Sequence, residues 1–153
     1  MKILVFGLPG SGKTYIAQEL KNIFGDRAEW FNADDIRTEC DDWDFSKAGR
    51  ERQNQRMRIL STQAVEKGKI AICDFICPLE YIREEFDADF EVFVDTIQEG
   101  RFSDTNKMFQ RPNYDDHNCI TPHHVVKHKR EGLDARIIAA HIEELIKSKQ
   151  NQP

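Results

Sequence analysis

Short apolar runs alternate with segments of helical periodicity along most of this chain. The apolar runs are rich in β-branched and aromatic residues and predict strands at residues 2–6, 29–32, 69–75 and 90–95. The intervening segments predict helices at 13–24, 47–67, 79–86 and about 135–148, with a helical turn and loop at 34–43. The expected inward residues are Ile16, Leu20, Ile23 and Phe24 in the first helix and Ile138, Ile142, Leu145 and Ile146 in the last.

This order of elements predicts an α/β fold in three layers, with a mostly parallel, doubly wound sheet between helices. Residues 1–153 are expected to form a single domain, since this length suits one core and the sequence contains no repeat or linker. Residues 96–122 are polar without a clear period, and about 97–116 is interpreted as a lid. In such sheets ligands bind at the carboxyl ends of the strands, so residues that follow the strands are the first site candidates.

Charge and cysteine content limit the partners and the cellular compartment that we expect for the protein. The formal net charge is −5, which disfavours non-specific binding to nucleic acid or anionic membranes. No apolar run approaches the roughly 18 residues that cross a bilayer. The four cysteines are dispersed, and they are expected to be reduced thiols of a cytoplasmic protein. The composition leaves the oligomeric state open, a homodimer included.

Residues 7–14 carry the clearest chemical signal, Gly-Leu-Pro-Gly-Ser-Gly-Lys-Thr between a predicted strand and a predicted helix. Glycines let the backbone curl until its N–H groups point at phosphate oxygens, and the helix adds its positive end. Lys13 is expected to reach the β- and γ-phosphates and the Thr14 hydroxyl to bind Mg²⁺. The chain is therefore expected to have the P-loop NTPase fold and to bind ATP and Mg²⁺ through Gly7, Leu8, Pro9, Gly10, Ser11, Gly12, Lys13 and Thr14.

A polar segment, Asn32-Ala33-Asp34-Asp35-Ile36-Arg37, follows the second predicted strand. A carboxylate at this rim can accept the proton of an acceptor hydroxyl or hold a metal-bound water, and Arg37 can neutralise an anionic acceptor. Because the chain is barely longer than a minimal core, these residues favour a kinase over a GTPase or a motor. The structural alternative is that Asp34 or Asp35 caps a short helix and that Arg37 is solvated.

Five ordered motifs over about residues 3–96 resemble those of the adenylylsulfate (APS) kinase family. They are the glycine loop, segment 32–37, Asp44-Phe45-Ser46-x-x-x-Arg50, Phe75-Ile76-Cys77-Pro78 followed by Arg83, and Glu91-Val92-Phe93-Val94-Asp95-Thr96. The resemblance implies an ATP-dependent kinase of sulfate assimilation that phosphorylates the 3′-hydroxyl of APS, a small nucleotide, to give 3′-phospho-APS.

The resemblance also implies roles for single residues. Asp34 would be the catalytic carboxylate beside Lys13, and Arg37 and Arg50 would bind the phosphosulfate. Phe45 and Phe75 would clamp the adenine, unless they are core residues. The acceptor-side set is Asp34, Arg37, Phe45, Arg50, Gln53, Phe75, Ile76 and Cys77. The other arginines between residues 50 and 58 are interpreted as a solvated face.

The chain departs from the family pattern in three places. Asn32 and Glu80 replace an Asp and an Arg, and the lid is shorter, although it keeps the cations Arg101, Lys107 and Arg111. Asp74 ends the third predicted strand, the position of a carboxylate that orients Mg²⁺ in other P-loop enzymes, so Asp34 and Asp74 are both metal candidates with Thr14.

Two other functions stay open beside APS phosphorylation. An Asp at a strand end with an Asp-Asp-x-Arg segment is similar to polynucleotide kinases, so a polynucleotide or nucleoside kinase is the second hypothesis. A nucleotide-binding sensor without catalysis is the third. His117, Cys119, His123, His124 and His128 have roughly the spacing of zinc ligands, but solvated histidines are the preferred interpretation because a second Cys pair is missing.

Overall fold

The computed structural model describes residues 1–152 of the chain. Its elements follow in the order β1 (Lys2–Phe6), α1 (Lys13–Phe24), a short 3₁₀ helix (Gly25–Arg27), β2 (Ala28–Asn32), α2 (Ala33–Cys40), α3 (Lys47–Glu66), β3 (Ile70–Asp74), α4 (Glu80–Phe86), β4 (Phe90–Val94), α5 (Ser103–Met108), β5 (His123–Val126) and α6 (Leu133–Gln150). Every predicted strand and helix is confirmed within two residues at each end. The structure adds α5 and β5, which the periodicity did not predict.

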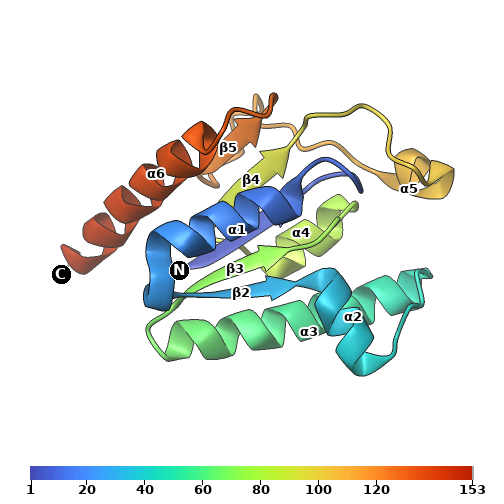
Figure 1. Ribbon diagram of the computed structural model, residues 1–153, viewed down its shortest axis with the longest axis horizontal. Helices are drawn as coiled ribbons and strands as arrows, with labels where there is room; N and C mark the ends of the chain where they lie inside the picture. Colours follow the sequence, from blue (N-terminus) through green and yellow to red (C-terminus); the bar gives the residue numbers. More distant parts are fainter. Residues whose placement is uncertain (153) are drawn as a thin grey trace.

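The five strands form one sheet in the order β2-β3-β1-β4-β5 (Figure 1). All four pairings within the described residues are parallel, so the sheet expected to be mostly parallel is parallel throughout. The carboxyl ends of the strands therefore lie along one edge. The chain crosses from one side of β1 to the other between β3 and β4, and this change of direction opens the ligand position at the carboxyl end of β1.

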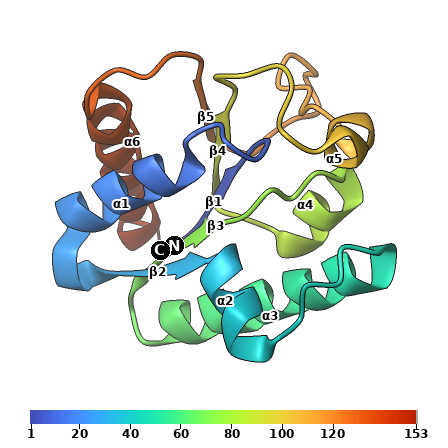
Figure 2. The same ribbon diagram turned by 45° about the vertical axis from the view of Figure 1, so that its right-hand side comes forward.

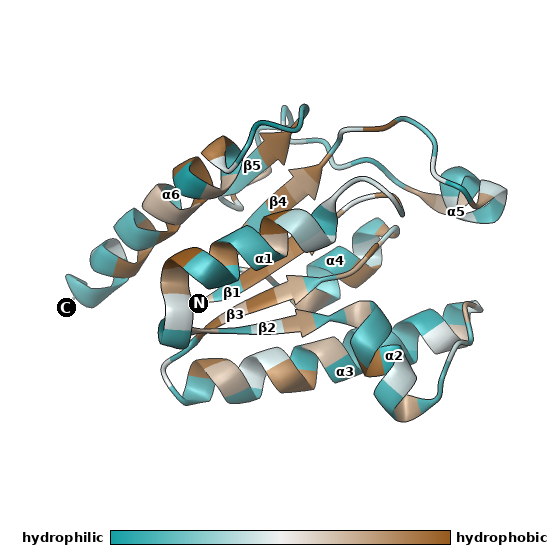
Figure 3. Ribbon diagram, in the orientation of Figure 1, coloured by the Kyte–Doolittle hydropathy of each residue, from teal (hydrophilic) through white to brown (hydrophobic). Residues whose placement is uncertain are grey.

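Helices cover both faces of the sheet. Figure 2 shows α1 and α6 on one side and α3 and α4 on the other, and a separate hydrophobic cluster fills each of the two interfaces. The strands are mostly apolar while the outer faces of the helices are largely hydrophilic (Figure 3). The expected inward face of α1 is confirmed for Ile16, Leu20 and Phe24 but is wrong for Ile23, which lies at the solvent edge of that face.

The sequence analysis expected solvated histidines before α6, which is confirmed for the exposed His117 and His128 but not for His123 and His124, because residues 123–126 form the edge strand β5. His123 is opposite Glu91 of β4, and its ring stacks on Tyr114 with centroids 3.8 Å apart. Two consecutive histidines conceal the strand pattern in the sequence, since their polarity resembles that of a loop. Within residues 1–152, no three His, Cys, Asp or Glu side chains converge as metal ligands, so the zinc alternative finds no ligand set.

Two further sequence expectations concern the whole chain. All four cysteines carry free thiols, as expected for a reduced protein. In the part of the chain that the structure describes, no helix has both the length and the apolar character needed to span a bilayer.

Candidate functional site

The glycine loop joins the end of β1 to the start of α1 at the carboxyl edge of the sheet. Gly12 is the N-cap of α1 with φ +102°, a left-handed conformation that side chains rarely adopt. At Gly7 a Cβ would lie 2.5 Å from the carbonyl oxygen of Val94, closer than any real contact. The loop therefore requires glycine at both positions, and it presents the unpaired N–H groups of the first turn of α1 as an anion site.

Lys13 lies at the end of this loop, within the first turn of α1. Its Nζ donates to the carbonyl oxygen of Leu8 at 3.1 Å, so the ammonium lies over the loop itself. Burial lowers the pKa of Lys13, while the nearby charges of Asp74 and Asp34 raise it. The lysine is thus held between the glycine loop and two carboxylates, where a phosphate would be its natural partner.

Three polar side chains meet beside Lys13 at the ends of neighbouring strands. The Asn32 amide donates to Asp74 Oδ2 at 2.9 Å, and the Thr14 hydroxyl donates to the same oxygen at 3.3 Å. Asn32 and Asp74 are direct partners in the register of β2 and β3. Asp74 is only 2% exposed, and burial raises its pKa, although the hydrogen bond from Asn32 and the charge of Lys13 lower it.

The residues at this edge fit a Mg²⁺–nucleotide. The buried carboxylate of Asp74 forms no ion pair with any basic side chain among residues 1–152, and it touches the hydroxyl expected to bind Mg²⁺. Carboxylate and hydroxyl oxygens are the donors that Mg²⁺ prefers. The adjoining glycine loop has no room for a side chain at Gly7, and the first turn of α1 leaves its N–H groups for phosphate.

Asp34 lies in the first turn of α2 and its side chain is exposed. The expectation that Asp34 or Asp35 caps this helix is wrong, because Asn32 is the N-cap and its side chain accepts from the Asp35 N–H at 3.1 Å. The Asp34 carboxylate is therefore not used for capping. It lies close enough to Lys13 for its charge to raise the pKa of the lysine.

Arg37 and Arg50 surround the ring of Phe45. The Arg37 guanidinium lies 4.4 Å from the ring centroid and that of Arg50 lies 5.6 Å from it, while Phe45 itself is 46% exposed. Arg37 is not solvated, as the structural alternative expected, but only 5% exposed, and it donates to the backbone oxygens of Asp42 and Asp44 at 2.9 and 3.2 Å. It binds the loop that carries Phe45.

Two neighbouring arginines complete the anchoring of this loop, so the interpretation as a solvated face holds for the exposed Arg52 but is incomplete, since Arg52 and the half-buried Arg56 also form ion pairs. Arg52 pairs with Asp42 and Asp44, and Arg56 also pairs with Asp42. Hydrogen bonds from both arginines hold the pKa of Asp42 well below its usual range. The aromatic ring of Phe45 is thus presented on a loop that ion pairs and hydrogen bonds fix to α3.

Three residues of the predicted acceptor set, Gln53, Phe75 and Cys77, are buried. Gln53 donates to the backbone oxygen of Ala33 at 2.9 Å, which ties α3 to the start of α2. Phe75 is 7% exposed and packs edge-on against Phe86, and Cys77 lies in the same hydrophobic cluster. Their contact with an acceptor remains a prediction, although the backbone of the same loop reaches the glycine loop, where Gly7 N–H donates to Ile76 O at 3.4 Å.

The segment interpreted as a lid contains α5 and is tied down at its far end. Arg111 donates to both oxygens of Asp95, at 2.9 and 2.5 Å, directly after β4. Burial raises the pKa of Asp95, but the hydrogen bonds from Arg111 and Lys127 outweigh it and hold the pKa below its ordinary value. The other two predicted lid cations, Arg101 and Lys107, are exposed.

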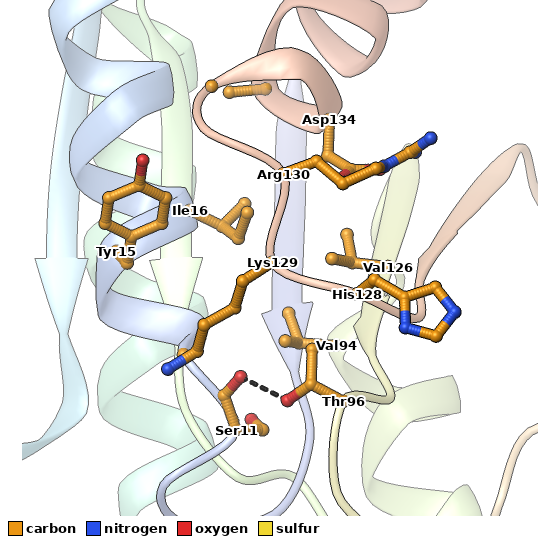
Figure 4. Close-up of a pocket in the computed structure, with 13 residues that line it drawn as sticks. Ser11, Tyr15, Ile16, Val94, Thr96, Val126, His128, Lys129, Arg130 and Asp134 are labelled. Carbon is orange, nitrogen blue, oxygen red and sulfur yellow. Dashed lines mark hydrogen bonds and ion pairs between the residues drawn. The ribbon is translucent and has the colours of Figure 1, made fainter.

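A pocket that the sequence analysis missed lies between the start of α1 and the loop joining β5 to α6 (Figure 4). Thr96 donates to the backbone oxygen of Ser11 at 2.6 Å at its floor. Lys129 extends along the pocket toward the glycine loop, with Tyr15 on one side and His128 on the other. The basic run at 127–130 before the last helix was the available signal for this pocket.

The glycine loop lies between a central parallel strand and the first helix, with Lys13 and Thr14 at its end. A buried carboxylate, Asp74, ends the neighbouring strand β3, and these features together define the P-loop kinase class. The model of the adenylylsulphate kinase family matches residues 1–113, and the chain belongs to this family. The resemblance noted in the sequence is confirmed.

Solved structures agree with this fold at low sequence identity. The Mycobacterium tuberculosis APS kinase CysC, in complex with AMPPNP and APS, is 21% identical, with a TM-score of 0.67 over 95% of this chain and 96% of that one. Chaetomium thermophilum Kti12 with ADP-AlF3 is 15% identical (TM-score 0.69, 94% and 98% covered). Shikimate kinase from Acinetobacter baumannii is 18% identical (TM-score 0.55, 99% and 95% covered). No curated protein matches the chain.

Proposed function

We propose that this protein transfers the γ-phosphoryl group of ATP to the 3′-hydroxyl of APS, giving ADP and 3′-phospho-APS. The observation that carries the proposal is the loop 41–46, which presents the half-exposed ring of Phe45 beside the guanidinium groups of Arg37 and Arg50. Asp34, in the first turn of α2, is near enough for its charge to act on Lys13. Membership of the adenylylsulphate kinase family supports the same acceptor. The solved APS kinase with AMPPNP and APS bound has the same fold.

The donor side would bind the nucleotide from the glycine loop outward. The N–H groups at the start of α1 would hold the phosphates, and the pocket beside Tyr15 and Lys129 would receive the nucleoside end. Thr14 and Asp74 would hold Mg²⁺, which would neutralise the negative charge of the phosphates. Lys13 would leave its present bond to Leu8 O and donate to the transferring phosphoryl group.

The acceptor side would bind a nucleotide that carries both an aromatic base and negative charge. Phe45 offers a half-exposed ring for stacking, and Arg50 lies beside it with its Nε bonded to the backbone oxygen of Phe45 at 3.0 Å. Asp34 would accept the hydrogen bond of the 3′-hydroxyl and orient its oxygen toward phosphorus. Because such transfer needs little covalent chemistry from the protein, positioning and charge stabilisation would supply most of the rate enhancement.

An acceptor screen tests the proposal. The purified protein with ATP and Mg²⁺ is offered APS, a 5′-hydroxyl oligonucleotide, shikimate and simple nucleosides, and ADP formation and phosphorylated product are both measured. We expect turnover with APS and none with Lys13→Ala, while Lys67→Ala, an exposed lysine at the end of α3, keeps wild-type activity. Product from another acceptor in the absence of any from APS would overturn the proposal.

One observation favours a second candidate, a polynucleotide or nucleoside kinase. The contact between Asp74 and Thr14 is the arrangement expected of the strand-end Asp that led to that hypothesis. Product from the oligonucleotide alone in the screen would support this candidate. ATP binding without turnover on any acceptor would instead support a sensor.

A further inference from the structure

Arg83 of α4 is a buried arginine that the site described so far does not use. It is 6% exposed, and its guanidinium lies beside the stacked rings of Phe6 and Phe109, 4.9 and 5.9 Å from their centroids. Phe6 ends β1 directly before the glycine loop, while Phe109 follows α5 in the lid segment. An arginine so deeply placed must have its hydrogen bonds satisfied inside the protein.

The two partners of the guanidinium belong to two different segments. Arg83 Nη1 donates to the backbone oxygen of Cys77 at 2.8 Å, and Nη2 donates to the backbone oxygen of Gln110 at 2.6 Å. Cys77 lies in the loop 75–79, whose backbone is expected to meet the acceptor. Gln110 lies where the lid segment returns to the sheet. One side chain therefore connects the acceptor loop to the lid.

Two further hydrogen bonds join the same two segments. The Gln110 N–H donates to Pro78 O at 2.8 Å, and the Glu80 N–H donates to the Gln110 side-chain oxygen at 2.8 Å. The next residue of the lid, Arg111, is bound to Asp95. Loop and lid thus form a single connected unit with Arg83 at its buried end.

The residue that Arg83 contacts in the acceptor loop has an unusual backbone. Cys77 has φ +46°, a left-handed conformation that is costly for a residue with a side chain. Such a conformation persists only where surrounding contacts determine it, and the hydrogen bond from Arg83 to the Cys77 carbonyl is one of them.

We propose that Arg83 is a positioning residue for the acceptor: its fork holds the left-handed Cys77 in the acceptor loop and ties that loop to the lid at Gln110. Arg83 does not touch the reacting atoms in this account, because it is buried behind the loop. The effect on catalysis rests on the proposed kinase function, whereas the effect on the loop and the lid does not.

Amide hydrogen exchange tests the link without any acceptor. Arg83→Met keeps an unbranched apolar stem beside the two rings but removes both donors. We expect the Gln110 amide, which is bonded to Pro78 O, to exchange about tenfold faster in the variant, as the loss of a hydrogen bond to a charged group implies. The Ala71 amide, bonded to Met1 O at the far end of the sheet, is the internal reference and is expected not to change. Unchanged exchange at Gln110 would overturn the link.

A double-mutant comparison tests the role of the strained residue. Glycine adopts φ +46° without strain, whereas alanine removes the same thiol and keeps the strain. In the Cys77→Ala background, Arg83→Met is expected to raise the KM for APS about tenfold and to leave the ATP dissociation constant within about threefold. In the Cys77→Gly background, Arg83→Met is expected to raise the KM for APS clearly less. Equal losses in the two backgrounds would overturn the proposed action through Cys77.

A surface variant covers the case in which Arg83→Met does not fold. Gln110→Ala leaves Arg83 intact and removes only the oxygen that accepts from the Glu80 N–H. We expect a smaller increase in exchange at the Gln110 amide, of about threefold, and wild-type exchange there would count against the connected unit. If neither the wild-type protein nor any variant phosphorylates APS, the proposed function fails. The exchange data still decide whether Arg83 connects the loop 75–79 to the lid.

Discussion

The donor side and the acceptor side of this site are built from different parts of the chain. On the proposed donor side, backbone N–H groups of one continuous loop, residues 7–14, would form the phosphate site, and the backbone geometry at Gly7 and Gly12 requires glycine. On the acceptor side, side chains from α2, α3 and the loops 41–46 and 75–79 combine. A binding site made of backbone is encoded locally, whereas one made of side chains depends on how separate segments pack.

The same contrast appears in how the charged side chains are used. Within residues 1–152, the Lys13 side chain donates a single hydrogen bond, to Leu8 O of its own loop, and it can turn to a ligand. Arg37, which the resemblance assigned to the acceptor, already donates to two backbone oxygens of the loop that carries Phe45. An arginine that fixes a loop can shape an acceptor site without contacting the acceptor. We therefore expect the acceptor side to include residues that act by position as well as residues that bind.

The largest effect on activity is expected when Asp34 is replaced, and its neighbour Asp35 provides the comparison. Both Asp34 and Asp35 are exposed in the first turn of α2, but only the charge of Asp34 acts on Lys13. We expect Asp34→Ala to lower kcat by at least about a hundredfold with ATP affinity retained, as the loss of a positioned proton acceptor implies. Asp35→Ala is the matched control and should keep most of the activity. A near-normal rate for Asp34→Ala would remove its assigned role.

The next effect tests whether the donor side includes Asp74. Since Asp74 is bonded to the Thr14 hydroxyl, Asp74→Asn should weaken the binding of Mn²⁺ to the ATP complex, by about ten- to a hundredfold. Electron paramagnetic resonance of bound Mn²⁺ measures this without any acceptor. Asp115→Asn, at an exposed position in the lid segment, is the control. Unchanged Mn²⁺ affinity would place the metal away from Asp74.

A smaller effect is expected at the ring of Phe45. Replacing it with leucine keeps an apolar side chain but removes the aromatic face, so the KM for APS should rise about three- to tenfold while the KM for ATP stays constant. Phe102→Leu, an exposed aromatic in the lid segment, is the control. Equal changes in both KM values would mean that Phe45 supports the fold and not the acceptor.

The smallest effect concerns the acid stability of the lid anchor. The folded pKa of Asp95 lies below the unfolded value of about 3.9, so its ionised form stabilises the folded state above about pH 4, and this stabilisation is lost as the pH falls through the folded pKa. Denaturant unfolding between pH 6 and pH 3 should show a steeper loss of stability for the wild type than for Asp95→Asn. Parallel curves would contradict this assignment.

The sequence predicted the donor side better than the acceptor side. The glycine loop, the strand before it and α1 were predicted with their observed bounds, because local patterns and one motif specify them. The N-cap of α2 was assigned to the wrong residue. Asn32, Asp34 and Asp35 are all residue types that cap helices well, and the backbone conformation determines that Asn32 takes this role. β5 was not predicted because His123 and His124 hide its alternation of apolar and polar residues. The pocket beside Lys129 was therefore not predicted either, since the loop after β5 forms one of its walls. The burial of Gln53 and Phe75 depends on contacts between distant segments, which no local pattern reveals.

The position of the transferred phosphate tests the central claim most directly. Phosphorus NMR of the protein with ATP, Mg²⁺ and APS follows both the loss of the γ-phosphate and the group that receives it. We expect one new phosphate monoester on the 3′-oxygen of the APS ribose for each ADP formed. ADP accompanied only by inorganic phosphate, or a phosphate ester formed on a 5′-hydroxyl oligonucleotide with none on APS, would contradict the account.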